Sequence, residues 1–445
     1  MRGCRSLLHV GRPPTGRDRW HTTVLLKRLM GAPPQNGGVH VDERIRNAAT
    51  GAVAALLRNQ QAAGEHSGGV VVAAFLRGEL IVHAWTGPGA KADSLVMPAS
   101  VAKGCTAAAL AVLHCRGLLD YTMRVSSLWP GFERNGKGGV TVEQAISHRA
   151  GLCTSLPGPR VALAMLYAFF SRGWRAKSDV GVAWAARLRP QWPPGSWAAY
   201  HPVSWSWLVI GIAAGCSGGL HIRDLFAEHV AIPLASATDM FLGVLPTHER
   251  RRLLRQVRPS VVRLWHSTAS KSVNLLVRLV WLFVAWLEAL IMTTIFNNFS
   301  VFAAVCLPSS NGYWTALAVA RLYAALVNAG SVQLPNSSSS VQLLDASKLQ
   351  ALLLKIRTDA RVPSSEGDAT AMNSLGFSPW PSLGAPTDSL VLGHGGMGGS
   401  VAWADVDRGL SVVVLRTTYH PVSLGACAAT RELCECIRAH ALRDA

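Results

Sequence analysis

Ser100 and Lys103 are one helical turn apart in this 445-residue chain, so on a helix their side chains share a face. A serine hydroxyl is a weak nucleophile until an adjacent base takes its proton. A lysine made neutral by burial and by the positive end of a helix could serve as that base. On its own, this spacing is more typical of an N-cap serine followed by an exposed lysine.

A second segment, residues 194–202, ends in Tyr200-His201-Pro202, directly before a helix predicted to begin near Val203. A phenol held close to a lysine can relay protons during a reaction. A tyrosine packed at the start of a helix would explain the same pattern. This segment therefore indicates a catalytic tyrosine only in combination with the Ser100–Lys103 pair and with a third segment, described next.

A third segment contains His394, Gly395, Gly396 and Met397 and leads at Ser400 into a predicted strand. Glycines let a backbone approach a ligand closely, and a strand edge beside a nucleophile can aim an N–H at an oxyanion. Taken singly, this is a glycine-rich turn with one histidine.

The elements that must position these segments follow from the hydropathy pattern. It predicts strands near both ends of the chain and helices in between. Helices are expected over 42–62, 100–115, 343–355 and 423–443, with hairpins over 69–85 and 400–415, mostly helical structure over 120–330, and a loop over 357–390. We therefore expect an α/β fold of the α+β type, with one antiparallel sheet built from both termini, flanked by helices, and an inserted all-helical domain.

Four parts of the chain are expected. Residues 1–38 form a basic leader and linker, 39–120 the first part of the α/β domain, 121–342 the helical domain, and 343–445 the second part of the α/β domain. The arginine-rich, acid-poor leader is typical of a mitochondrial transit peptide and equally of a disordered basic tail. A mitochondrial or cytoplasmic location, with membrane association as a further option, is expected.

The composition is 49% apolar and 15% charged, which favours a sizeable core over disorder. The net charge of +18 favours anionic partners, but the basic residues are scattered, so we expect no nucleic-acid partner. The nine cysteines are dispersed without a CxxC pair, which indicates reduced thiols rather than disulfides or zinc ligands. We expect no metal and no cofactor.

An insert at 250–300 stands apart from the rest. Six arginines lie between 250 and 263, and an apolar run over 275–296 follows, interrupted by Arg278 and Glu288. A spanning helix needs about 20 apolar residues, and a central glutamate is expensive there. Three interpretations stay open: a buried helix of the helical domain, a helix lying on an anionic membrane surface through 250–296, and a transmembrane helix.

The three segments in this order resemble the S-x-x-K, tyrosine and H-G-G motifs of the serine β-lactamase and penicillin-binding-protein superfamily. The resemblance is strongest to its class C-like esterase and mitochondrial β-lactamase-like branch, and it covers about residues 42–440. Residues 147–152 resemble the family's S-H-x-[AS]-G-L loop, and the segment starting at Pro308, with Asn311-Gly312, resembles its P-x-x-N-G helix.

The resemblance implies a β-lactamase/transpeptidase-like fold and a set of roles. Ser100 would be the acylated nucleophile, and Lys103 and Tyr200 would share the general base and acid work. The backbone N–H groups of Ser100 and Met397 would form the oxyanion hole.

The same resemblance implies that His201, His394, Gly395, Gly396 and Met397 contact the substrate. The sequence departs from the family at Pro202, where asparagine is usual. The missing amide donor favours an ester over a lactam or a peptide. The expected substrate is a small molecule or a lipid.

Two alternatives remain beside a serine hydrolase of this family. Residues 215–219 fit the G-x-S-x-G elbow of α/β-hydrolases with Ser217 as nucleophile, but the preceding residues 205–214 favour a helix where that motif requires a strand. The protein could also be a catalytically inactive scaffold of the same fold, docked on a membrane through 250–296. No metalloprotease, P-loop or dinucleotide motif is present.

Overall fold

The computed structural model describes most of the chain. The described residues are 38–45, 47–153, 174–269, 274–298, 305–335, 337–359, 374–378, 389–422 and 427–443. The predicted leader, apart from Gly38, lies outside them, as does most of the predicted 357–390 loop.

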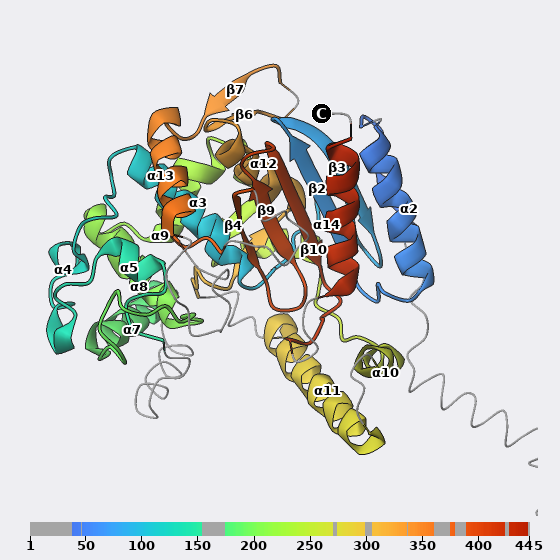
Figure 1. Ribbon diagram of the computed structural model, residues 1–445, viewed down its shortest axis with the longest axis horizontal. Helices are drawn as coiled ribbons and strands as arrows, with labels where there is room; N and C mark the ends of the chain where they lie inside the picture. The colour runs from blue at the N-terminus through green and yellow to red at the C-terminus, as the bar shows by residue number, and fades with distance from the viewer. Residues whose placement is uncertain are drawn as a thin grey trace, which may run out of the picture.

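A six-stranded antiparallel sheet forms the centre of the molecule, in the order β1-β3-β2-β10-β9-β8 (Figure 1). Its strands are β1 (His40–Val41), β3 (Glu79–Thr86), β2 (Val70–Leu76), β10 (Leu410–Arg416), β9 (Val401–Asp405) and β8 (Val391–Gly395). The central pair joins the two ends of the chain, with Val70 opposite Arg416 and Leu76 opposite Leu410. The expected antiparallel sheet built from both termini is therefore confirmed.

Helices cover both faces of this sheet (Figure 1). Because side chains alternate along a strand, Val71, Ala73 and Phe75 of β2 join one apolar core, while the residues between them join another. The first core contains α3 (Val101–Cys115) and α12 (Ala316–Val327), and the second contains α2 (Ala48–Ala62) and α14 (Ala428–Ala441). Burial on both faces explains why β2 and β10 are nearly continuous apolar runs.

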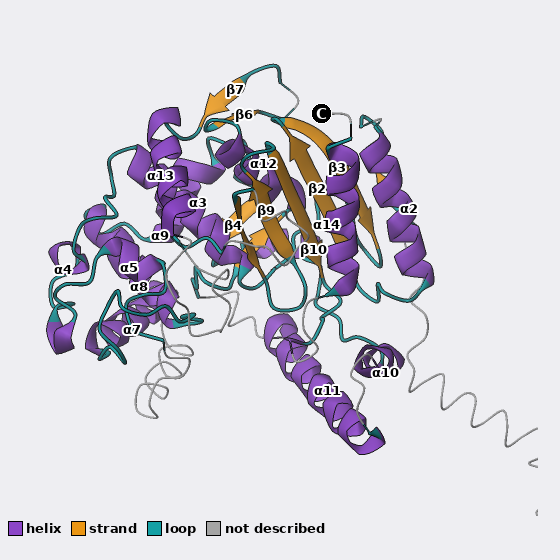
Figure 2. Ribbon diagram, viewed as in Figure 1, coloured by secondary structure: helices purple, strands orange, loops and turns teal. Residues whose placement is uncertain are grey.

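The remaining helices gather mostly beside α3 (Figure 2). They are α4 (Val125–Leu128), α5 (Val142–Ile146), α7 (Trp174–Arg187), α8 (Ser204–Cys216), α9 (Ile222–Phe226) and α13 (Ala346–Asp359), with short 3-10 turns at Arg134–Gly136 and Thr247–Arg252 and a π-helical turn at Ala227–Ala231. One small strand pair, β4 (Met240–Leu242) with β5 (Gly312–Trp314), interrupts the mostly helical pattern expected for 120–330. A second pair, β6 (Ser331–Gln333) with β7 (Ser340–Gln342), follows directly after that range. The domain boundaries at 120 and 342 stay predictions, although α12 packs against the sheet.

Two element boundaries differ from expectation for local reasons. The first helix begins at Ala48 rather than 42, because the Asn47 side chain caps it by accepting from the Thr50 N–H at 2.8 Å. The hydropathy pattern did not indicate strand β8, because glycines hide its alternation, whereas the resemblance of residues 393–405 to the family's last strand pair did imply a strand here. At Gly393 a Cβ would lie 2.6 Å from the Ala402 carbonyl oxygen on the neighbouring strand, so the close pairing requires glycine.

The insert forms α10 (Val261–Ala269) and α11 (Leu275–Asn298), which project together from the body (Figure 2). Of the apolar window Leu275–Thr294, only 11% is buried, so the interpretation as a buried helix of the helical domain is wrong. By length and composition alone, α11 is the one described helix that could cross a membrane.

Candidate active site

Ser100 lies at the N-terminus of α3, as predicted. Extended residues precede it, because Val96 bridges to Trp314 and Leu95 to Leu253. Between them and the helix, Ala99 has a left-handed φ of +49°, a conformation that persists in a non-glycine residue only where the surroundings impose it. The Ser100 side chain makes no capping hydrogen bond to the helix, so the N-cap interpretation does not explain this serine.

Two predicted partners converge on the Ser100 hydroxyl. The Tyr200 Oη donates to Ser100 Oγ at 2.9 Å, and Lys103 Nζ lies 3.5 Å from the same oxygen. The Lys103 Nζ also lies 4.6 Å from the centroid of the Tyr200 ring. Lys103 is fully buried, which rules out the exposed lysine of the alternative interpretation. Residues 100 positions apart in sequence thus meet around one oxygen atom.

The surroundings of Lys103 contain hydrogen-bond acceptors but no counter-charge. Its Nζ donates to the carbonyl oxygens of Pro202 at 3.3 Å and Ser309 at 3.1 Å, and no carboxylate among the described residues pairs with it. Burial therefore holds the pKa of Lys103 well below its usual value. A buried amine without a carboxylate favours the neutral form, which is the form that accepts a proton.

Sequence reasoning did not foresee the role of the 305–311 turn in placing the Ser309 carbonyl. The Asn311 side chain ties this turn together, with Oδ1 accepting from the Leu307 N–H at 2.7 Å and Nδ2 donating to the Val305 carbonyl at 2.6 Å. Ser206 on α8 donates to the Ser309 hydroxyl at 2.6 Å. The P-x-x-N-G pattern that begins at Pro308 was the sequence feature that could have indicated this turn.

His201 is buried directly after Tyr200. Its Nε2 accepts from the Leu152 N–H at 3.0 Å, and its Nδ1 lies 2.5 Å from the Ala199 carbonyl oxygen. Burial lowers the pKa of His201 to about 4, so the ring is neutral at neutral pH. This geometry differs from the substrate contact expected for His201. Both ring nitrogens are already hydrogen-bonded to backbone groups, and these bonds fix the segment that carries Tyr200.

His148 is a second positioning residue, and it was missed as a site residue. Its Nδ1 accepts from the His201 N–H at 3.0 Å, and its ring centroid lies 4.9 Å from that of Tyr200, with the two rings tilted by 48°. The residue has a left-handed φ of +61° and is buried, and burial lowers its pKa well below the usual value. The family-like loop at 147–152 was the sequence signal for it.

The third predicted segment also lies next to Tyr200. His394 on β8 is buried with its ring 5.9 Å from the Tyr200 ring, and burial lowers its pKa to about 3. At Gly104, one position after Lys103, a Cβ would lie 3.2 Å from the His394 Cβ and 2.1 Å from the Tyr323 hydroxyl. The absence of a side chain there allows this close approach between α3 and β8.

The turn after β8 reaches the residues just before Ser100. A Cβ on Gly396 would lie 2.0 Å from the Pro98 carbonyl oxygen, so the turn contacts that backbone directly. Gly395 ends β8, and Met397, 36% exposed, follows on the turn. Within the described ranges, the backbone N–H groups of Ser100 and Met397 have no hydrogen-bond acceptor, which leaves both available to an oxyanion.

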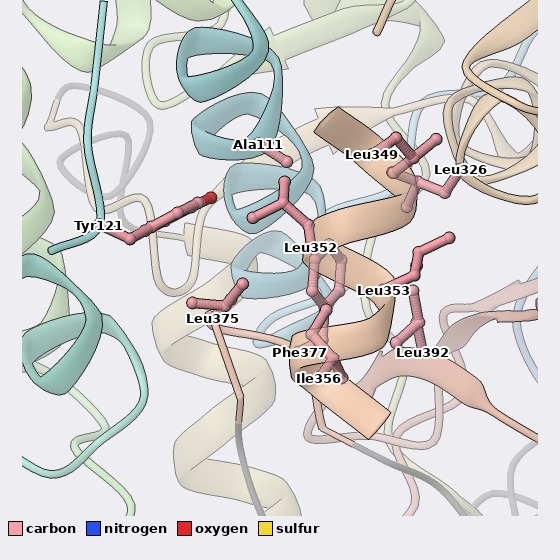
Figure 3. A pocket seen from close by; sticks show the side chains of 10 residues that line it. All are labelled: Ala111, Tyr121, Leu326, Leu349, Leu352, Leu353, Ile356, Leu375, Phe377 and Leu392. Carbon is pink, nitrogen blue, oxygen red and sulfur yellow. The ribbon is translucent and has the colours of Figure 1, made fainter. Parts of the chain in front are cut away.

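The rival nucleophile and the apolar cavity beside α3 do not form a comparable site. Ser217 follows the end of α8, and its Oγ donates to the Ala213 carbonyl at 2.6 Å, so the strand required by an α/β-hydrolase elbow is not there. An apolar cavity between α3 and α13 lies around Ala111, about three helical turns from Ser100, and is lined almost wholly by hydrocarbon (Figure 3). No cluster of three or more metal-ligating side chains occurs among the residues that the structure describes.

Comparisons with known proteins agree with this architecture. The sequence model of the β-lactamase family matches residues 53–433. The esterase/β-lactamase LipL of Mycobacterium tuberculosis is 26% identical over 362 residues, which cover 79% of this chain and 77% of that protein.

Solved structures give the same result. A family VIII carboxylesterase superposes with a TM-score of 0.69 at 24% identity, over 90% of this chain and 99% of that one. A penicillin-binding-protein homologue from Caulobacter crescentus superposes with a TM-score of 0.68 at 25% identity, over 90% of this chain and 100% of the other. The β-lactamase/transpeptidase-like fold expected from the sequence is therefore confirmed.

Proposed function

This chain belongs to the β-lactamase family, and from that premise we propose that it is a serine hydrolase that cleaves an ester or a small amide through an acyl-serine intermediate. The observation that carries the proposal is the convergence of Tyr200 Oη at 2.9 Å and the buried Lys103 Nζ at 3.5 Å on the Ser100 hydroxyl. The relatives named above as esterases and carboxylesterases support the same class of reaction.

The surroundings of Lys103 suit it to start the reaction. A neutral amine has two N–H bonds and one lone pair. The carbonyls of Pro202 and Ser309 accept the two hydrogens, which leaves the lone pair for the Ser100 hydroxyl. In the proposed first step, Lys103 takes the Ser100 proton as Oγ bonds to the substrate carbonyl carbon.

The negative charge then develops on the carbonyl oxygen. The free N–H groups of Ser100 and Met397 are the proposed donors to it, and one such donor is typically worth about 3 kcal/mol of barrier. The Tyr200 hydroxyl passes a proton to the leaving oxygen or nitrogen and regains one from Lys103. A water molecule attacks the acyl-serine carbonyl in the second half of the reaction, with the same groups working in reverse, and the acid product leaves.

Pro202 supports an ester as the preferred substrate. Its carbonyl is occupied by Lys103, and its ring offers no donor for a substrate amide. A catalytically inactive scaffold remains the second candidate, favoured by this departure from the family pattern.

The experiment uses a fluorophosphonate probe and a chromogenic short-chain ester on the wild type, Ser100→Ala and Ser217→Ala. We expect Ser100→Ala alone to abolish labelling and to reduce hydrolysis by about a thousandfold or more. Ser217→Ala is the matched control, because it removes a serine hydroxyl at the end of a neighbouring helix. No reaction in the folded wild type would favour the scaffold, and loss in Ser217→Ala alone would reject Ser100.

A further inference from the structure

The polarity of α11 is inverted relative to a helix on the surface of a soluble protein. The face turned away from the body carries large apolar side chains that are 38–70% exposed: Leu276, Val280, Phe283, Leu287 and Ile291. The side chains of Ala285, Ala289 and Thr293 on the opposite face are buried. A helix in water has its apolar stripe on the buried side, so the outward stripe indicates an apolar contact beyond the chain.

Both charged residues of α11 are held by the protein itself. The Arg278 guanidinium stacks 3.8 Å from the centroid of the Trp265 ring on α10 and donates to the Trp265 carbonyl at 3.0 Å. The Glu288 Oε1 accepts from the Tyr419 hydroxyl at 3.0 Å and from the Val422 N–H at 2.6 Å. Glu288, whose charge would be costly in an apolar environment, therefore faces the body of the protein.

We propose that the outward face of α11 binds an anionic bilayer surface, with the helix lying along the interface and its other face attached to the body. The helix is about 36 Å long, which gives an extended strip of apolar side chains. A transmembrane position would require separating Glu288 from its two partners. The Glu288 contacts therefore favour a helix lying on the bilayer over one crossing it.

The charge next to the insert specifies the kind of lipid. Arg250, Arg251, Arg255 and Arg258 are exposed just before α10, and none of them forms an ion pair with a described residue. The other two arginines of the cluster, Arg252 and Arg263, are neutralised by carboxylates. Basic groups beside an interfacial apolar helix are attracted to the negative surface of anionic lipid. This inference stands apart from the proposed hydrolase activity, because no residue of the candidate active site enters it.

The test is co-sedimentation of the full-length protein with phosphatidylcholine vesicles, with and without phosphatidylserine. We expect binding to the vesicles that contain phosphatidylserine, weakened by high salt. Leu276→Glu, at a position 70% exposed on α11, should lower this binding by about tenfold or more. The matched control is Leu354→Glu, the same change at a position 62% exposed on α13, and it should bind as the wild type does.

The charge contribution is tested separately with Arg255→Glu/Arg258→Glu. This variant should lose binding to phosphatidylserine vesicles several-fold while keeping the wild-type melting temperature.

Four results would overturn the proposal. They are a wild type that binds neither vesicle, a Leu276→Glu variant that binds as the wild type does, and bound protein that resists alkaline carbonate extraction, as a spanning helix does. The fourth is lipid-free self-association, measured by analytical ultracentrifugation, that Leu276→Glu abolishes, because the face would then join two copies of the chain.

Discussion

Helices α3 and α11 are both strongly apolar, yet the body of the protein buries one and leaves most of the other exposed. In α3, His114 is the one side chain that is not buried. In the apolar part of α11, only 11% of the residues are buried. The two differ in side-chain size. Apart from Lys103 and Thr106, the first half of α3 consists of alanine, glycine, cysteine and valine, which let the sheet and the neighbouring helices approach closely. In α11, leucine, valine, isoleucine, phenylalanine and tryptophan predominate. Apolar composition indicates that a segment is shielded from water. Side-chain size helps to indicate whether the rest of the protein or another apolar surface does the shielding.

The charged residues of both helices point inward, with different consequences. Lys103 in α3 meets only neutral acceptors, so its charge is suppressed and its lone pair becomes available for chemistry. Glu288 in α11 accepts hydrogen bonds from a hydroxyl and a backbone N–H of the body, so it anchors the helix. The same inward orientation thus produces a base in one helix and an anchor in the other.

Removing the buried base should have the largest effect. In Lys103→Met, which keeps the apolar stem, we expect kcat/KM for an ester to fall by about 10²–10⁴-fold. In the wild type, kcat/KM should rise with pH as Lys103 loses its proton, because the neutral amine is the active form, and this rise should begin well below the usual lysine pKa. Lys91→Met, at an exposed lysine, is the control. Wild-type turnover in Lys103→Met would remove this residue from the mechanism.

Tyr200→Phe should have a smaller kinetic effect, because Lys103 still lies 3.5 Å from the nucleophile. We expect turnover to fall by about a hundredfold or more with little change in melting temperature. Steady-state kinetics and thermal unfolding of the same preparation give the two values. Turnover equal to that of the wild type would mean that the 2.9 Å hydrogen bond has no catalytic role.

A pair of identical truncations tests the contrast between the two helices directly. Leu110→Ala in α3 removes a fully buried side chain and should lower the free energy of unfolding by about 2–5 kcal/mol. Leu276→Ala in α11 removes one that is 70% exposed and should change it by less than about 0.5 kcal/mol in lipid-free buffer. Urea unfolding measures both. Equal losses would mean that α11 is covered in solution.

The smallest expected effect is a pH dependence of stability to which two buried histidines of the site contribute. Burial lowers the pKa of His201 to about 4 and that of His394 to about 3, whereas both titrate near 6.5 in the unfolded chain. The unfolded state therefore binds more protons between these values, and the free energy of unfolding falls as the pH falls from about 6.5 toward 4. His394→Gln should make this slope shallower in urea titrations at pH 7 and pH 4.5. An unchanged slope would show that His394 does not contribute.

The sequence predicted the features that depend on short-range patterns. The apolar runs at 69–76 and 410–415 indicated strands of two hairpins, and the three spaced motifs indicated Ser100, Lys103 and Tyr200, which the fold brings together. The family and the fold class are confirmed, while the catalytic roles stay predictions.

Other features depend on tertiary context that local patterns do not encode. Strands β1, β4, β5, β6 and β7 are two or three residues long, too short for a recognisable alternation. His201 was expected at the substrate, but its ring nitrogens hold the backbone of Leu152 and Ala199, contacts that depend on how the 147–152 loop folds. The outward face of α11 was left open among three interpretations, because hydropathy does not say on which side of a helix the protein lies.

The pairing of β2 with β10 has a consequence for synthesis of the chain. Strand β2 is almost wholly apolar, and its pairing partner Leu410–Arg416 is translated more than 330 residues later, since 410 − 76 = 334. At about 5–20 residues per second, one edge of β2 stays unpaired on the order of tens of seconds after it emerges from the ribosome. During that interval it is an open template for strands of other nascent chains. Holdase chaperones that cover apolar strands should therefore associate with ribosomes that translate this message, from the emergence of β2 until β10 is complete.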